Sequence, residues 1–390
     1  MATRNMCPFL QICKRSLLQT VRRPVYWIGI LFLPLFCFLL LSSLMEEGLP
    51  VKAPAAIVDR DGTAVSRELT QQLSGMQMVD VVAMPESFTE ARHLMQEGKI
   101  YGYFIIPENF ESELLAGRAP VITFYTNMTF YVPASLLYKT FKTTAMYTKA
   151  GVASQVMNSV GFTSDPTALL LPVSISIRGI GNPGLNYAIY LCVSFLPCVL
   201  QLMIILITVF SLGQEIKYGS SVRLMRMARG SVLRAVTGRL LPQTLIWWVI
   251  AIFMESWMFR WQGYPMHGSW FWITLSELLF VLASQGFALL IFGAVPNLRL
   301  SLSVGALLGI LSFSIAAFSF PMQSMYPAIG IFSYILPTRY NFLIYIDQAL
   351  NGIDIYYSRW WFTAYILFIL APLPLMPRIK RELMKPVYVP

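Results

Sequence analysis

Residues 213–239 hold the side chains that are best suited to contact a protein partner. They follow an apolar stretch and begin with mixed charges and a glycine, and arginines then recur among leucines and methionines up to Arg239. This pattern predicts a short helix with a basic face at a membrane exit, which either docks into the groove of a partner or binds anionic lipid headgroups. The candidate contact residues are Gln214, Glu215, Lys217, Tyr218, Gly219 and Ser220.

The amino-terminal arm, residues 1–23, is a second candidate. Apolar residues recur in it at steps of three and four, and basic residues occupy the opposite face. The pattern is typical of an amphipathic helix that lies in the membrane interface, and Pro24 ends it. The simpler alternative is a positive flank that only fixes the topology. The apolar face comprises Met6, Phe9, Leu10, Cys13 and Leu17, and the basic candidates are Lys14, Arg15, Arg22 and Arg23.

Few charges lie in or beside the long apolar stretches: Glu255, Arg260, Glu277 and Asp347. Glu277 lies about two helical turns into one of these stretches. A carboxylate inside a membrane is by default a functional candidate. The alternative, which the sequence favours, is that the long side chain of Arg260 or Arg339 reaches it near the outer surface.

The sequence offers no basis for catalysis or for metal binding. It has two histidines and five cysteines, and their positions fit neither a zinc cluster nor a Cys/His nucleophile. Its one Gly-Lys pair, Gly98-Lys99, lacks the upstream glycine of a phosphate-binding loop. We therefore expect no catalytic residue, no metal and no cofactor in this chain, and any ATP-Mg to be bound by a separate ATPase subunit.

Membrane-spanning helices must position these residues. Of the 390 residues, 56% are hydrophobic and 12% are charged, whereas soluble domains carry roughly 25% charged residues. A helix needs about 20 apolar residues to cross a bilayer, and six stretches qualify or nearly do so. They are residues 25–45, 185–212, 240–259, 270–295, 301–320 and 360–376.

Residues 321–359 are apolar but are interrupted by Pro321, Pro327 and Pro337. Their helical pieces are too short to span, and irregular backbone inside a membrane survives only where protein or water satisfies it. We expect a re-entrant hairpin of two short helices there; the alternative is a loop that lies on the surface.

Lysines and arginines gather in the arm, in residues 213–239 and in the tail. With six crossings these segments share one side of the membrane, which is predicted to be the cytoplasm. The net charge of +10 is therefore a topology signal, and nucleic acid is not an expected partner. The first span is expected to remain as an anchor, because no cleavage site of the A-x-A kind follows it.

Residues 46–182 then lie on the opposite side of the membrane. Four β-rich runs alternate there with helical patterns, which predicts an inserted extracytoplasmic α/β domain with a largely parallel sheet. Asp59 to Gly62 form a predicted turn, and Ser87 with Glu90 begins a helix as a capping box. A longer helix over 133–159 and a return strand over 172–177 complete the domain. The runs are residues 55–59, 78–82, 101–106 and 121–125, and the helices are 64–73, 87–97 and 108–115.

This order of elements resembles the permease subunit of type-2 ABC transporters, in the branch with a large extracytoplasmic domain after the first span. The resemblance covers nearly the whole chain. Its most specific stretches are residues 56–61 (AIVDRD), 66–69 (SREL), 100–110 (IYGYFIIPENF), 215–220 (EIKYGS), 238–242 (GRLLP) and 336–340 (LPTRY). Lys217 and Val222 stand where the family usually has acidic residues. Either the contact with an ATPase uses other charge partners, or the chain is the less active half of a heteromeric pair.

The resemblance implies the fold class and the division of the chain. The fold is a polytopic α-helical membrane protein of six spans with a re-entrant hairpin and an inserted α/β domain. Its parts are an interfacial helix (1–23), a first span (24–45), the insert (46–182) and a five-span domain (183–390) that contains the coupling loop 213–239 and the hairpin 321–359.

The resemblance also implies a function, an ATP-driven exporter of a hydrophobic or amphipathic compound in the cytoplasmic membrane. Expected partners are ABC ATPase subunits, a second permease copy or paralogue, membrane lipid and a periplasmic adaptor. The main alternative is a membrane-anchored receptor or scaffold whose outside domain binds a partner or ligand. An ion- or proton-coupled carrier is a third possibility, for which the sequence lacks repeats and buried ionisable relays.

Overall fold

The computed structural model describes residues 7–44, 52–76, 78–116, 120–127, 134–135, 137–142, 187–316, 322 and 325–386. The chain divides into two compact units. The helical unit consists of Met1–Gly48 with Gly179–Pro390, and the sheet unit consists of Leu49–Arg178. The bounds of the sheet unit lie close to those of the predicted insert, residues 46–182.

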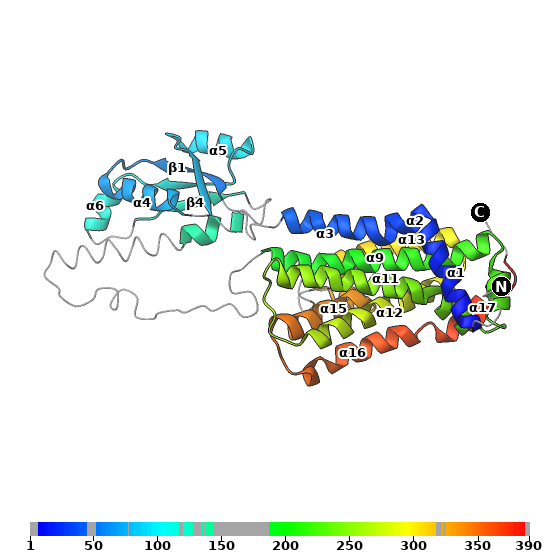
Figure 1. Ribbon diagram of the computed structural model, residues 1–390. Coiled ribbons are helices and arrows are strands. Elements are labelled where there is room, and N and C mark those ends of the chain that lie inside the picture. The colour runs from blue at the N-terminus through cyan, green and yellow to red at the C-terminus, as the bar shows by residue number, and fades with distance from the viewer. Residues whose placement is uncertain are drawn as a thin grey trace. The chain divides into compact units, whose positions relative to one another are not determined.

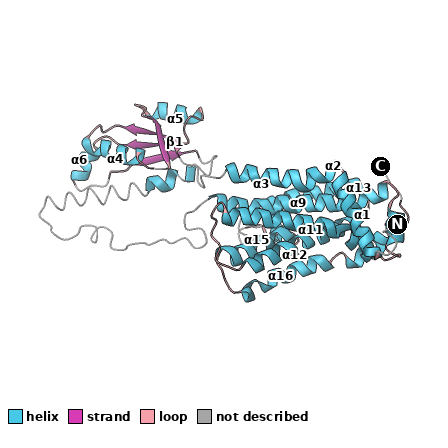
Figure 2. Ribbon diagram, viewed as in Figure 1, coloured by secondary structure: helices cyan, strands magenta, loops and turns pink. Residues whose placement is uncertain are grey.

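The helical unit is a bundle of long helices with shorter ones at its ends (Figures 1 and 2). Its helices are α1 (Pro8–Arg22), α2 (Pro24–Tyr26), η1 (Trp27–Phe32), α3 (Leu33–Leu44), α9 (Tyr187–Lys217), α10 (Ser221–Met227), α11 (Val232–Arg260), α12 (Trp270–Ala294), α13 (Leu298–Ile315), α14 (Pro327–Ser333), α15 (Pro337–Tyr345), η3 (Ile346–Leu350), α16 (Ile355–Leu370), η4 (Leu373–Leu375) and α17 (Met376–Met384). Six stretches of the described chain are long and apolar enough to cross a membrane. The protein is thus a polytopic helical membrane protein.

The sixth of these stretches is longer than the sequence predicts. Residues 360–376 were expected, and the structure has one helical stretch over Ile355–Met384. Pro372 and Pro374 interrupt the predicted span; Pro374 lies in the 3-10 turn η4, and Pro372 directly precedes this turn. A proline is tolerated in the first turn of a helix, where its missing N–H has no partner to lose, so the chain passes through the turn and continues as α17.

The predicted hairpin region contains α14 and α15, and the side chain of Gln201 connects it to two long helices. The amide oxygen of Gln201 on α9 accepts hydrogen bonds from the backbone N–H (2.8 Å) and the hydroxyl (2.7 Å) of Thr338. Its Nε2 donates to the Ser312 hydroxyl of α13 at 3.0 Å. All three residues are buried, so α15 is fixed to α9 and α13. That this region re-enters the membrane remains a prediction.

The sheet unit contains one four-stranded sheet in the order β2-β1-β3-β4. Strand β1 pairs in parallel with β2 and β3, and β4 runs antiparallel to β3. Helices α4 and α5 lie on opposite faces of the sheet (Figure 1). The elements are β1 (Ala53–Asp59), α4 (Ala64–Ser74), β2 (Val79–Ala83), α5 (Phe88–Gln96), β3 (Gly102–Ile106), α6 (Phe110–Leu115) and β4 (Thr123–Thr126).

Several expectations for this unit can be compared with the described residues. The Ser87 hydroxyl accepts from the backbone N–H of Glu90, as expected at the start of α5. The predicted long helix over 133–159 is described only at 134–135 and 137–142, which are helical. The rest of that helix and the return strand over 172–177 lie outside the described residues.

The acidic residues of the AIVDRD stretch organise the loop at the end of β1. Asp59 accepts from the backbone N–H groups of Asp61 (3.0 Å) and Gly62 (3.1 Å), whose φ of +64° favours glycine. Asp61 in turn accepts from the N–H groups of Phe110 (2.9 Å) and Glu111 (3.1 Å) at the start of α6. The stretches 56–61 and 100–110 are therefore coupled by helix capping, which is a structural role.

We expect Asp61→Ala to weaken the start of α6, because two N–H groups of the first helical turn lose their acceptor. Loss of such a cap costs about 1–2 kcal/mol, which corresponds to a factor of roughly 5–30 in a local opening equilibrium. Amide hydrogen exchange of Phe110 and Glu111 in the full chain should accelerate accordingly. Glu86→Ala, at an exposed position before α5, is the control and should leave these rates unchanged; equal rates in both variants would show that Asp61 is not the cap.

Candidate functional site

The coupling segment, residues 214–220, begins inside a helix. Helix α9 continues to Lys217, so the first part of the segment is its last turn. Gly219 has a φ of +65°, a backbone conformation that glycine adopts without a steric penalty. This turn brings the Ser220 hydroxyl back to the carboxylate of Glu215, to which it donates at 2.5 Å.

Glu215 is the centre of an ion-pair network that joins three helices. Only 2% of its side chain is exposed. Its Oε2 pairs with Arg15 Nη2 of α1 at 2.6 Å, and its Oε1 lies 3.8 Å from Arg239 Nε of α11. A buried carboxylate is stable only when cations and hydrogen-bond donors compensate its lost hydration. Glu215 therefore requires α1 and α11 to remain in place beside α9.

Arg239 is the second buried charge of this network, and only 2% of its side chain is exposed. Its guanidinium donates to the Ser211 hydroxyl at 2.9 Å and to the Tyr26 hydroxyl at 3.1 Å. A further hydrogen bond goes to the side-chain oxygen of Gln19. These partners belong to α9, α2 and α1, so the planar, many-donor head of one arginine fixes the relative positions of four elements.

Arg23, which lies between α1 and α2, also contacts the coupling segment at the surface. Arg23 donates to the side-chain oxygen of Gln214, and its guanidinium lies 5.3 Å from the centre of the exposed Tyr218 ring. An exposed cation–π contact of this kind contributes about 0.5–1 kcal/mol. Tyr218, Gly219 and Lys217 thus form an exposed tip on a base that is held by buried charges.

Helix α1 packs on α11 through a face that the sequence pattern did not single out. Ile12, Ser16 and Thr20 are buried, and the Ser16 hydroxyl donates to the Arg239 carbonyl at 2.5 Å. A side chain at Gly238 would place its Cβ 2.9 Å from Ile12 Cγ2, so the glycine permits this close approach. Leu10 and Leu17 belong to the predicted apolar face of the arm. Both are exposed and are therefore available to contact lipid.

The four basic candidates of the arm do not share one environment. Lys14 and Arg22 are exposed, whereas Arg15 and Arg23 are half-buried and contact the coupling segment. Lys14 and Arg22 can therefore meet the membrane surface, whereas Arg15 and Arg23 hold the arm against the coupling segment. Spacing along one helix could not show this, because their partners lie roughly two hundred residues away in the chain.

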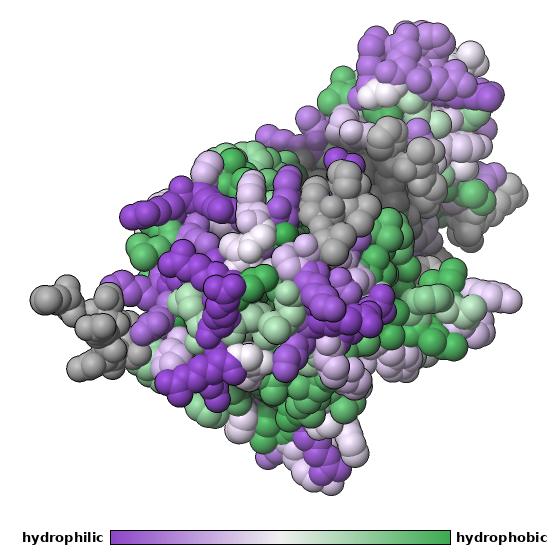
Figure 3. Space-filling view, turned by 90° about the vertical axis from the view of Figure 1, so that its right-hand side faces the viewer, coloured by the Kyte–Doolittle hydropathy of each residue, from purple (hydrophilic) through white to green (hydrophobic). Residues whose placement is uncertain are grey.

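The short basic helix that was predicted after the coupling segment is α10. Leu224 and Met225 pack inward, whereas Arg223, Arg226 and Arg229 are exposed. Figure 3 looks onto the end of the helical unit that carries α1 and α17, and hydrophilic side chains gather there among apolar ones.

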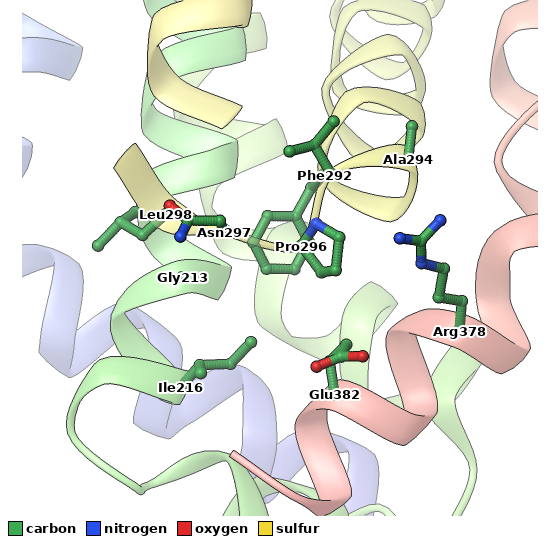
Figure 4. Close-up of a pocket in the computed structure, with 10 residues that line it drawn as sticks. Gly213, Ile216, Phe292, Ala294, Pro296, Asn297, Leu298, Arg378 and Glu382 are labelled. Atoms are coloured by element: carbon green, nitrogen blue, oxygen red, sulfur yellow. The ribbon is translucent and has the colours of Figure 1, made fainter. Parts of the chain in front are cut away.

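A pocket of about 320 Å³ opens beside the base of the coupling segment (Figure 4). Ile216 of α9 lines one side, and Arg378 and Glu382 of α17 lie on the other. Ile216 is nevertheless buried and belongs to the same hydrophobic cluster as Ile379 and Leu383 of α17, so the pocket lies beside a packed contact between α9 and α17. The remaining lining residues are Gly213, Phe292, Ala294, Val295, Pro296, Asn297 and Leu298.

Glu277 lies in α12 and is buried, but the partner expected from the sequence is wrong. Asn341 Nδ2 of α15 donates to its Oε1 at 2.7 Å. Arg339, which was expected to reach it, donates instead to the Ser333 hydroxyl at 3.2 Å and lies 4.8 Å from the Tyr334 ring. The two residues leave α15 in different directions, and the asparagine is the one that faces α12. Arg260 is exposed at the end of α11.

Metal-binding groupings were also sought. Within the described ranges, no three His, Cys, Asp or Glu residues lie close enough together to hold a metal ion.

Comparison with known families gives one match. The family model described as ABC-2 family transporter protein matches residues 24–373. The match begins directly after α1 and ends in η4, so it includes the sheet unit, the coupling segment and most of the helical unit. No protein of curated function matches the chain.

Proposed function

We propose, from the premise that this chain belongs to the ABC-2 family of transporter proteins, that it is the permease of an ATP-driven exporter of a hydrophobic or amphipathic compound. It is a multi-pass membrane protein and an ABC transporter permease, and this family implies ABC ATPase partners. In our proposal the chain itself has no catalytic residue and holds no cofactor. ATP-Mg is bound and hydrolysed by a separate subunit.

The observation that supports this proposal is the network of Glu215, Arg239 and Arg15 beneath an exposed tip. An ATPase that contacts Tyr218 and Gly219 acts on the last turn of α9. Because Glu215 is bonded to α1 and lies beside Arg239 of α11, a displacement of that turn is shared by three helices. A partner that binds one arrangement of these helices better than another shifts the population by its differential affinity.

The proposal includes an orientation and an assembly. Both termini and the coupling segment face the cytoplasm, residues 46–182 are extracytoplasmic, and α1 lies in the interface of the cytoplasmic membrane with Leu10 and Leu17 towards lipid. The basic residues exposed on α10 and α17 support this orientation through the positive-inside rule. A second permease copy or a paralogue completes the conduit, and a periplasmic adaptor is a further expected partner.

One observation favours a second candidate function. The sheet unit is compact by itself, as a receptor or scaffold that binds a partner outside the membrane would require. Proteoliposomes that contain the chain and its cognate ATPase separate the two functions. Transport that depends on ATP supports the permease, whereas ligand binding without any transport supports the receptor.

Co-purification tests the coupling assignment. Deletion of residues 214–220 is expected to abolish co-purification of the cognate ATPase with the full chain. The control is Tyr357→Ala, an exposed residue at the start of α16, at the end of the helical unit remote from α1 (Figure 1), which should leave the complex intact. An unchanged complex after the deletion would show that the ATPase docks elsewhere.

A further inference from the structure

Two carboxylates face one cavity inside the membrane-spanning bundle. Glu255 lies on α11 and Glu277 on α12, and each is 6% exposed. Both line a cavity of about 20 Å³ whose other walls are apolar. These walls are Val193, Leu196, Pro197, Leu200, Ala251, Met254 and Met258.

The hydrogen bonding of the two carboxylates is incomplete. Asn341 donates to Glu277 Oε1, but Glu255 Oε2 has no hydrogen-bond partner among the described residues. Within the same described part of the chain, neither carboxylate forms an ion pair with a lysine, arginine or histidine. Glu255 and Glu277, which we call the carboxylate pair, thus present oxygen acceptors that no cationic side chain of the described residues neutralises.

The other titratable groups around the carboxylate pair are three tyrosines and a cysteine, and none of these side-chain types can become a cation. Tyr345 of α15 lies near Glu255, and its hydroxyl is buried and unpartnered among the described residues. Tyr365 of α16 lies near Glu277. Tyr264 and Cys192 lie close to Tyr345. None of these groups supplies the positive charge that a buried carboxylate needs.

Two ionised carboxylates cannot share such a site without compensation. Each loses its hydration on burial, and like charges in a medium of low dielectric constant repel strongly. The size of the cavity limits what can compensate them. Its volume of about 20 Å³ accommodates about one water molecule, which favours a proton or a small cation over an organic ammonium group. A single small positive charge would reduce the repulsion between the two carboxylates and would also fit into the cavity.

We propose that Glu255 and Glu277 form a binding site for one positive charge, either a proton or a small alkali cation, within about two helical turns of Arg260 and Trp270, where α11 ends and α12 begins. When a proton is bound, it adds to one carboxylate oxygen and leaves the pair with a charge of −1. The site is separate from the coupling segment, so it adds a cation-binding step to the proposed permease.

Infrared spectroscopy of the full chain in lipid nanodiscs tests the proton. The C=O stretching band of a protonated carboxyl group is expected at neutral pH in the wild type and is expected to be lost when Glu255→Gln and Glu277→Gln are combined. Glutamine keeps the shape of glutamate and can still accept from Asn341, so the fold is expected to persist. The control, Glu86→Gln in the sheet unit, should leave the band unchanged.

Thermal unfolding of the same samples tests the alkali cation. If the site holds a sodium or lithium ion, the melting temperature of the wild type rises with the concentration of that ion against a choline reference, and the combined variant shows no rise. If the combined variant loses the carboxyl band of the wild type, the site binds a proton. If it loses the rise in melting temperature with sodium or lithium, the site binds an alkali ion. If the wild type and the combined variant agree in both measurements, the proposal is overturned. Neither measurement needs the ATPase, so failure here leaves the proposed coupling untouched.

Discussion

Replacing Glu215 by glutamine is expected to remove most ATP-driven transport and to lower the free energy of unfolding by about 3–5 kcal/mol, the usual cost of breaking a buried ion pair from one side. The variant leaves Arg239 buried and Arg15 half-buried without their shared carboxylate. The Ser220 hydroxyl also loses a charged acceptor. Denaturant unfolding and transport in proteoliposomes measure the two effects.

A second substitution shows whether the buried charge causes this loss. Arg239→Met in the Glu215→Gln background removes the uncompensated cation, and part of the lost stability should return. The control is Glu382→Gln on α17, whose carboxylate is partly exposed and lies 3.7 Å from Nε of Arg381. It should cost less than about 1 kcal/mol. Equal costs for Glu215→Gln and Glu382→Gln would show that the network does not hold the helices together.

Gly286→Ala is expected to destabilise the bundle strongly, although alanine favours helices by about 1 kcal/mol over glycine. A Cβ at this position of α12 would lie 2.3 Å from the Phe368 carbonyl oxygen of α16 and 3.0 Å from its carbonyl carbon. Backbone atoms cannot move aside as a side chain can, so α16 must shift. We expect a loss at the upper end of the 1–3 kcal/mol that overpacking usually costs, or beyond it.

Gly330→Ala is the matched control for this prediction. It also lies in a helix and is buried, but among the described residues the nearest atom to its Cβ would be Met322 Cγ at 3.5 Å, an ordinary contact. This variant should melt at or slightly above the wild-type temperature. If the Gly286→Ala and Gly330→Ala variants had the same melting temperature, close packing of α12 on α16 would not limit stability.

The membrane-spanning elements could be predicted because their signal is local. A span needs an apolar stretch of a certain length, and such stretches can be counted in the sequence. The sixth span shows where this fails, since its predicted apolar stretch, residues 360–376, is short and is interrupted by prolines 372 and 374. Their effect depends on whether they lie in the first turn of a new helix, and the surrounding chain determines that.

The partners of the charged residues could not be predicted, because the contacts are distant in the sequence. Arg15 and its partner Glu215 are 200 positions apart, and Gln19 and its partner Arg239 are 220 positions apart. The pattern of α1 indicated an apolar and a basic face but not the face of Ile12, Ser16 and Thr20, which packs on α11. For Glu277, charge alone favoured an arginine, whereas the rotation of α15 presents Asn341. Gly238 was the one visible signal of close packing at this site.

Cross-linking at Tyr218 tests the central claim most directly, that a separate ATPase works this permease through the coupling segment. A photo-reactive amino acid is placed at this exposed position in the full chain, and the cognate ATPase is co-expressed in native membranes. The same probe at Tyr357 serves as the control. The account predicts an adduct with the ATPase from position 218 and none from position 357. Absence of the adduct at 218, in a complex that still transports, would contradict it.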